Sequence, residues 1–184
     1  PLLFLISAVG FGSGAIAGEE ARGTLGLLLS TPVARRQVVV HKFGALAIVT
    51  LILAVFWWAG LAIGATIVEM ELGFVRMAEA TASAALLGLA FGALALAIGC
   101  ATGKRGLSIG VTSAVGVAAS FLNALAPLVE ALDPAQKLSP FYYYIGADPL
   151  VNGLNLAHAT ALLGLTVAAL AVALVTFERR DLRV

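Results

Sequence analysis

The chain has 184 residues, of which 61% are hydrophobic and 11% charged, and its mean hydropathy is +1.04. Soluble domains contain about 45–50% apolar and about 25% charged residues, so this composition predicts a protein surrounded by an apolar solvent, the lipid bilayer. The net charge of only +1 argues against a nucleic-acid binder, for which a basic patch or stripe would be expected, so no nucleic-acid partner is expected.

Five apolar stretches without Lys, Arg, Asp or Glu follow one another along the chain. A spanning helix takes about 17–25 residues, and all five reach that length. Their apolar residues are continuous rather than alternating, which predicts helices and not strands. We therefore expect an all-α, polytopic transmembrane bundle that forms one domain over residues 1–184, with spans at 1–17, 43–68, 80–102, 107–129 and 156–177.

Basic residues are divided unequally between the two sides that these spans define. Of the 11 Lys and Arg residues, only Arg76 and Lys137 lie on one side, and the rest lie in segments 18–42 and 103–106 and at the C-terminus. By the positive-inside rule, the second group faces the cytoplasm of a prokaryotic-type inner or plasma membrane. The first span then runs inward, so we expect a preceding helix and six spans in the complete protein.

Glycines recur at every fourth position in several spans. At this spacing small residues share one helix face and let two backbones approach closely, which stabilises helix pairs in lipid. We expect packing within the bundle, with a seam to a second copy of the chain as the alternative for the first repeat. The repeats are Gly10–Gly14–Gly18, Gly60–Gly64, Gly88–Gly92 and Gly106–Gly110.

Segment 18–42 is the longest polar interruption on the cytoplasmic side. Its first acidic residues, Glu19 and Glu20, suit the positive end of a helix macrodipole. The charged start and the apolar end of residues 19–29 predict a helix that lies in the membrane interface or packs against another protein.

A second helix is expected after a break in the same segment. Thr31 and Pro32 have the residue types that are favoured at the N-cap and at the first helical position, and the helix would continue through Lys42 into the next span. The alternative is that the basic residues of this part only anchor the span to anionic lipid. These residues are Arg35, Arg36 and Lys42.

Segment 130–155 is the longer outer connection and contains three turns marked by proline. Tyr142, Tyr143 and Tyr144 lie between the second and third of these turns. One interpretation is a tyrosine anchor at the headgroup level. The other is a re-entrant turn or outer lid made of short helices that dip back toward the bundle.

The spans carry little candidate chemistry. They hold no charged residue that could form an ion pathway, and Cys100 is expected to be a small apolar filler. Gly-Lys-Arg-Gly at 103–106 lacks the pattern of a phosphate-binding loop, so we expect no enzyme activity and no cofactor in this chain. One helix carries several polar residues and is the best candidate to border a polar cavity. They are Thr112, Ser113, Ser120 and Asn123.

Residues 18–37, GEEARGTLGLLLSTPVARRQ, closely resemble the segment after the second span in permeases of the type-2 ATP-binding-cassette (ABC) exporter superfamily. That family shows Glu-Glu-x-x-Gly-Thr-Leu-x-x-Leu-Leu-Ser-x-Pro followed by Arg and Lys. Position 26, where the family often has Glu, is Gly here. Residues 139–143, 148–153 and 177–182 agree as well, so the resemblance covers the whole chain. The matching positions of the segment are Glu19, Glu20, Gly23, Thr24, Leu25, Leu28, Leu29, Ser30, Pro32, Arg35 and Lys42.

The resemblance implies a permease that pairs with a second permease copy and with nucleotide-binding subunits, which hold ATP and Mg²⁺. It places a coupling helix in segment 18–42, an outer gate in segment 130–155, and the spans 1–17 and 107–129 beside a central cavity. The implied ATPase contacts are Glu19, Glu20, Arg22, Gly23 and Thr24. The residues implied to pack the coupling helix onto the membrane domain are Leu25, Leu28, Leu29 and Pro32, and those of the outer gate are Ser139, Pro140, Phe141 and Tyr142.

Two functions are compatible with these patterns. The first is an exporter permease that uses ATP hydrolysed by a separate subunit. The second is a non-transporting assembly subunit similar to copper-enzyme maturation permeases. No residue pattern identifies the transported substrate.

Overall fold

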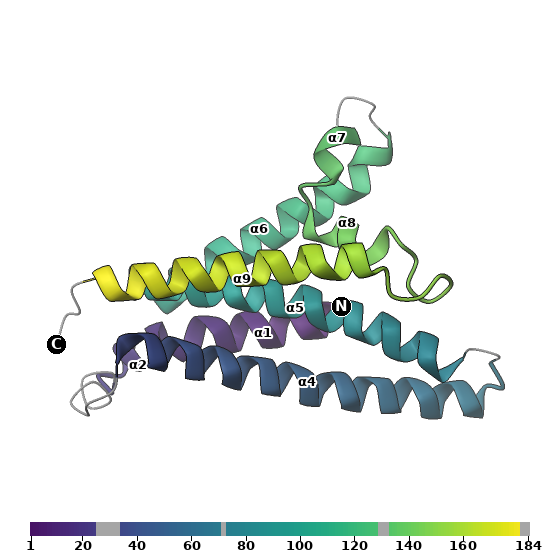
Figure 1. The fold of residues 1–184 in the computed structure, drawn as a ribbon, viewed down its shortest axis with the longest axis horizontal. Coiled ribbons are helices and arrows are strands. Elements are labelled where there is room, and N and C mark those ends of the chain that lie inside the picture. Colours follow the sequence, from purple (N-terminus) through teal and green to yellow (C-terminus); the bar gives the residue numbers. More distant parts are fainter. Residues whose placement is uncertain (25–33, 71–72, 129–132, 181–184) are drawn as a thin grey trace.

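The computed structural model describes residues 1–24, 34–70, 73–128 and 133–180, which form helices and turns with no strand among them (Figure 1). This confirms the predicted all-α membrane bundle. The helices are α1 (Leu2–Ala15), α2 (Ala17–Ala21), α4 (Arg35–Ile67), α5 (Phe74–Thr102), α6 (Arg105–Leu125) with the 3-10 turn η1 (Ala126–Leu128), α7 (Asp133–Gln136), α8 (Pro140–Ile145) and α9 (Leu156–Arg179).

Four helices are long and apolar enough to cross a membrane, namely α4, α5, α6 extended by η1, and α9. The predicted first span differs, because α1 has 14 residues, fewer than the about 17–25 that a span takes. It ends at Ile16, whose φ of −121° and ψ of −55° leave the helical region. The Ile16 side chain is fully buried between other helices, so packing at this end sets where α1 stops.

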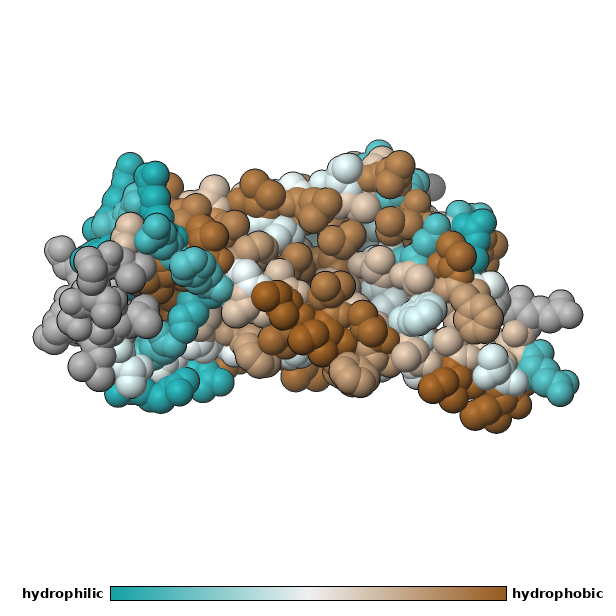
Figure 2. Space-filling model, turned by 60° about the horizontal axis from the view of Figure 1, so that its bottom comes forward, coloured by the Kyte–Doolittle hydropathy of each residue, from teal (hydrophilic) through white to brown (hydrophobic). Residues whose placement is uncertain are grey.

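Helix α5 is the centre of the bundle. In an apolar stretch of 18 residues of α5, 67% of the residues are buried inside the protein, against 11–22% in the corresponding stretches of the other three long helices. Helices α1, α4, α6 and α9 all pack on it, and in Figure 1 it runs between α1 and α9. Figure 2 shows hydrophobic surface over the middle of one face and hydrophilic surface at both ends, the distribution that a bilayer requires.

Close packing of α1 on α5 depends on three glycines. A Cβ atom added at Gly12 would overlap the carbonyl oxygen of Gly92, and one at Gly92 would lie 3.0 Å from the Cβ of Ala8. A Cβ at Gly88 would lie 2.9 Å from the Cβ of Phe4. The absence of side chains at these positions lets the two helix backbones approach, which is how small residues stabilise helix pairs in lipid.

Only one of the four glycine repeats, Gly88–Gly92, packs against the backbone of another helix. Gly14 and Gly18 face the Arg105 side chain instead. A seam with a second copy of the chain therefore stays a prediction. Five glycines of the repeats lie on helix faces that are open to such a contact. A Cβ would meet no atom within 4 Å at Gly10, Gly60, Gly64, Gly106 or Gly110.

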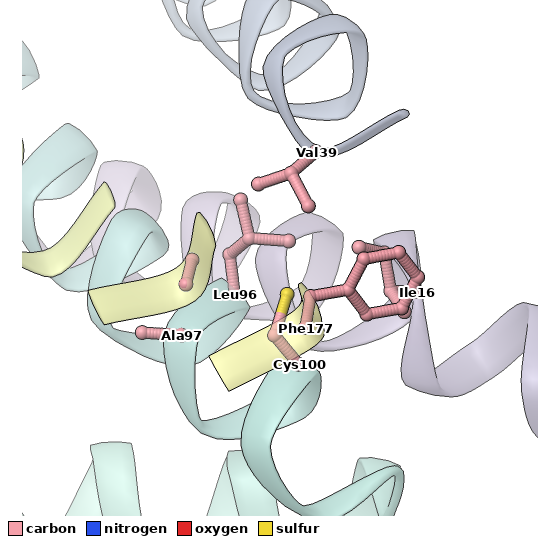
Figure 3. Packing of buried hydrophobic residues seen from close by; sticks show 7 residues of the cluster. Ile16, Val39, Leu96, Ala97, Cys100 and Phe177 are labelled. Carbon is pink, nitrogen blue, oxygen red and sulfur yellow. The ribbon is translucent and has the colours of Figure 1, made fainter. Parts of the chain in front are cut away.

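A buried apolar cluster joins four helices next to the end of the bundle that carries α2 and the end of α9. Ile16 follows α1, Val39 comes from α4, Leu96 and Cys100 from α5, and Phe177 from α9 (Figure 3). All five side chains are fully buried. The cluster holds the start of α2 and the last turn of α9 against α5.

Two helix starts differ from the prediction. Helix α4 begins at Arg35, after an extended Ala34, so no continuous helix runs through residue 34 into the span, and the predicted start at Thr31 and Pro32 lies outside the described residues. The Arg35 guanidinium donates to the carbonyl oxygen of Arg180, so a contact with the end of α9 fixes the first turn of α4. Local helix propensity cannot predict such a contact. Helix α5 begins at Phe74, before the predicted span, because its first turns contain charged residues that hydropathy assigns to a loop.

We predict that Gly12→Ala lowers the melting temperature of the detergent-solubilised protein. The added methyl group would push α1 away from the Gly92 carbonyl, and overpacking of this kind costs about 1–3 kcal/mol. Gly64→Ala is the matched control, because its Cβ would enter open space. Equal melting temperatures for the two variants would contradict the close packing of α1 on α5.

Candidate functional site

Helix α2 carries two of the predicted coupling residues, Glu19 and Glu20, and ends at a left-handed glycine. Gly23 has a φ of +72°. Its N–H donates to the Glu20 carbonyl (3.0 Å), and the N–H of Thr24 donates to the Glu19 carbonyl (3.1 Å), which is the Schellman pattern of a helix end. A continuous helix over residues 19–29 is therefore wrong, because the glycine terminates it before the leucines.

Glu20 forms an ion pair with Arg180, the residue that caps α9. Their side chains are only 16% and 17% exposed. Arg180 Nη1 also donates to the carbonyl oxygen of Cys100 near the end of α5, at 3.0 Å. Gly103, with a φ of +65°, ends α5 beside the pair, and a Cβ there would lie 2.6 Å from Glu20 Oε2. The pair thus joins α2, α5 and α9, and it fits because position 103 has no side chain.

Three further contacts connect the same end of the bundle to α4. They are an ion pair of Glu19 with Lys42, a hydrogen bond from Arg35 Nη1 to the Arg180 carbonyl oxygen (2.9 Å), and an ion pair of Arg36 with Glu178. The last is exposed and contributes little. We name the pairs Glu19–Lys42 and Glu20–Arg180 the ion-pair clasp. Both are sheltered, since each of the four side chains is 27% exposed or less.

The five residues predicted to contact an ATPase divide into two groups. The carboxylates of Glu19 and Glu20 pair within the chain, whereas Arg22, Gly23 and Thr24 are exposed. The residues predicted to pack the coupling helix onto the membrane domain lie outside the described residues. They are Leu25, Leu28, Leu29 and Pro32.

A cavity of about 620 Å³ lies between α1 and α6. Phe91 of α5 and Phe141 of α8 contribute to its wall, which is mostly apolar. Its hydroxyl groups come from α6, where Thr112, Ser113 and Ser120 border it. A role of these three residues toward a transported molecule stays a prediction. The other lining residues are Leu2, Leu5, Ile6, Val9, Gly10, Ile109, Gly116, Val117 and Phe121.

The polar residues of α6 have different partners. Thr112 is fully buried, and its Oγ1 has no hydrogen-bond partner among the described residues. Ser108 is also fully buried and donates to the carbonyl oxygen of Ala95 at 2.6 Å, which ties α6 to α5. Asn123 does not border the cavity, and its Oδ1 accepts from Gln136 of α7 at 3.5 Å.

Helix α8 packs on α5, α6 and α9. Ser139 caps it by accepting from the N–H of Phe141 (3.2 Å) and donates to the carbonyl oxygen of Ala119 on α6 (2.8 Å). Pro140 occupies the first turn. Phe141 is buried, with its ring centroid 5.8 Å from that of Phe91. Two of the residues assigned to an outer gate, Ser139 and Phe141, therefore contact α6 and α5, and the gating role stays a prediction.

The tyrosines of the outer segment contact α9. The rings of Tyr142 and Tyr143 lie 5.4 Å and 5.5 Å from the ring of His158. The Nδ1 atom of His158 is buried without a hydrogen-bond partner in the described part of the chain. Tyr142, assigned to the outer gate, thus packs on α9 and is not a lining residue of the cavity.

Two residues of the charged end were missed by the sequence analysis. Arg180 was assigned only to the basic C-terminal run, and Gly103 only to a short connection. The available signal was the presence of two adjacent carboxylates, Glu19 and Glu20, on the side of the membrane that is otherwise strongly basic. Such carboxylates are expected to find basic partners within the chain, but the sequence does not say which.

The family of the chain follows from a comparison with protein-family models. The model described as ABC-2 family transporter protein matches residues 1–182. Comparisons with curated proteins and with solved structures found no match. Members of the family are the transmembrane component of ABC transporters and are not themselves the ATPase, which implies an ATP-binding partner. The chain therefore belongs to the ABC-2 transporter family and is a multi-pass membrane permease component of an ABC transporter.

Proposed function

We propose that this chain is the permease of an exporter and that residues 18–42 couple it to a separate subunit that hydrolyses ATP. The ion-pair clasp is the observation that carries this proposal. It connects α2 to α4 through Lys42, and to α9 and α5 through Arg180. A displacement of α2 by a docked ATPase would therefore pull on the ends of three long helices at once.

The surface offered to the ATPase comes after the clasp. Gly23 and Thr24 are exposed, whereas Ala17 and Gly18 at the start of α2 are buried and Glu19 and Glu20 are half-buried in the clasp. A docking segment needs these two parts, since a contact surface transmits force only if the residues next to it are anchored. The tight turn at Gly23 directly follows the anchored part.

The path of the substrate would follow the cavity between α1 and α6. Helix α1 leads into α2 through Ile16, so one wall of the cavity is directly connected to the docking segment. At the α8 end, Phe141 contributes to the wall. Apolar walls with a few hydroxyl groups suit lipids, hydrophobic peptides or small drug-like molecules. We expect two permease copies in the working exporter, with the open glycine faces available for their contact.

The coupling role requires that the clasp lie on the cytoplasmic side, as the distribution of basic residues predicts. Single cysteines introduced at Thr24 and at Lys137 report this orientation, because both positions are exposed and the native Cys100 is fully buried. A membrane-impermeant maleimide applied to intact cells should label Lys137→Cys at once. Thr24→Cys should react only after the membrane is permeabilised. The opposite labelling pattern would overturn the orientation.

We predict that Thr24→Trp reduces the amount of ATP-binding subunit that copurifies with the permease, and its ATP hydrolysis, by roughly tenfold, because a clash in a packed interface costs about 1–3 kcal/mol. The variant leaves the clasp in place, since Thr24 uses its side chain only to donate to the Glu19 carbonyl.

Thr66→Trp is the matched control for this experiment. Thr66 is an exposed threonine at the opposite end of α4, and its hydroxyl likewise donates to a carbonyl of its own chain. It should retain the copurified ATPase. Equal retention by Thr24→Trp would show that this turn is not the docking surface.

A further inference from the structure

A second cavity, of about 590 Å³, lies along α1 between α4 and the start of α6. Helix α1 presents Phe4, Ala8 and Gly12 to α5. Positions two residues further along lie on roughly the opposite side of a helix. Those positions, Ile6, Gly10 and Gly14, form the floor of this cavity, and Ala45 and Leu46 of α4 line it from the side.

Three basic side chains line the end of this cavity next to the clasp, and they are Arg22, Lys42 and Arg105. The Arg105 guanidinium lies over Gly14, with its Nε 3.8 Å from where a Cβ would stand. Arg22 Nη2 lies 3.4 Å from the corresponding point at Gly18. Both guanidinium groups therefore lie over backbone that carries no side chains, at the same end of the groove.

Positive charge exceeds negative charge at this end of the cavity. Lys42 pairs with Glu19, whereas no carboxylate in the described part of the chain lies within ion-pair distance of Arg22 or Arg105. Planar guanidinium groups suit phosphate oxygens, to which they donate paired hydrogen bonds. The chemistry of this end therefore favours a phosphate-bearing anion.

The rest of the cavity selects for an apolar tail. Ile6 and Phe11 line it and are 74% and 53% exposed, so large apolar side chains flank the basic end. We propose that this cavity is a specific site for an anionic phospholipid. The phosphate binds Arg22, Lys42 and Arg105, and one acyl chain lies along Gly14 and Gly10.

The length of the groove agrees with an acyl chain. This cavity extends along α1 from Gly14 to Ile6, where it meets the cavity between α1 and α6, which shares Ile6 and Gly10 with it. From Gly14 to Ile6 the helix rises about 12 Å at 1.5 Å per residue. Half of a hydrocarbon core of about 30 Å is close to that length.

The bound lipid would contact α2 at Arg22, the clasp at Lys42 and α6 at Arg105. This differs from general attraction of basic residues to a charged membrane surface, because it requires particular side chains and the groove beside them. The site exists whether or not the segment couples to an ATPase, so its test uses the permease alone.

The test is native mass spectrometry of the purified permease in a non-ionic detergent, titrated with phosphatidylglycerol. We expect tight binding of one lipid, and binding roughly tenfold or more weaker in the double variant Arg22→Gln/Arg105→Gln, since each basic side chain contributes appreciably to attraction for anionic lipid. Zwitterionic phosphatidylcholine should bind weakly to both proteins.

The control for charge is Lys104→Gln/Arg179→Gln, which removes two exposed basic residues that do not line the cavity. Equal weakening by this variant would show surface attraction only and would overturn the site. Competition by inorganic phosphate as effective as that of a second phospholipid would show a free-anion site and overturn the lipid assignment.

The groove is tested separately from the charges. Ala45→Leu fills the cavity and should weaken lipid binding, whereas Ala101→Leu, at an exposed position outside it, should not. Melting temperatures close to that of the unmodified protein establish that both variants fold. Unchanged binding by Ala45→Leu would contradict the acyl-chain position.

Discussion

The ion pair between Glu20 and Arg180 is the interaction on which the charged end of this permease depends. Removing one partner of a sheltered ion pair destabilises the protein, because the other charge is left without compensation. Here the carbonyl oxygen of Cys100 also accepts a hydrogen bond from Arg180, and Gly103, which has no side chain, leaves room for the pair. Arg180 therefore fixes three helix ends, those of α2, α5 and α9. Arg35 connects a fourth, the start of α4, to the backbone of the same residue. This arrangement explains why a short, five-residue helix can hold a defined position at the membrane face.

The glycine packing of α1 connects the charged end to the interior of the membrane. Gly12, Gly88 and Gly92 bring α1 close to α5, and this contact leaves the opposite face of α1 free to line both cavities. Because α1 continues into α2 after Ile16, the wall of the cavities and the proposed docking segment belong to one short stretch of chain. Force applied at α2 would reach the cavities through α1 and would reach α9 through the clasp.

The sequence predicted the bundle well, because hydropathy reports directly which residues need lipid around them. It predicted helix ends less well. The α1 stretch is apolar to residue 17, yet its helix stops at Ile16 because the side chain packs between other helices, and α2 stops at Gly23 because of backbone geometry. The partners of Glu19 and Glu20 could not be predicted, since Arg180 is far away in sequence and only the folded chain brings it near. The polar residues of α6 were visible as a set, but which of them border the cavity depends on the rotation of that helix, and Asn123 lies elsewhere.

The most direct test of this account exchanges the charges of the central ion pair. The measurement is the ATP hydrolysis rate of the permease assembled with its ATP-binding subunit, relative to that subunit alone. Glu20→Arg and Arg180→Glu should each abolish the permease-dependent change in rate, and the double variant, which restores an opposite-charge pair, should recover a substantial part of it. A folded double variant that is no better than either single variant, or single variants that couple normally, would contradict the claim that the clasp transmits the motion.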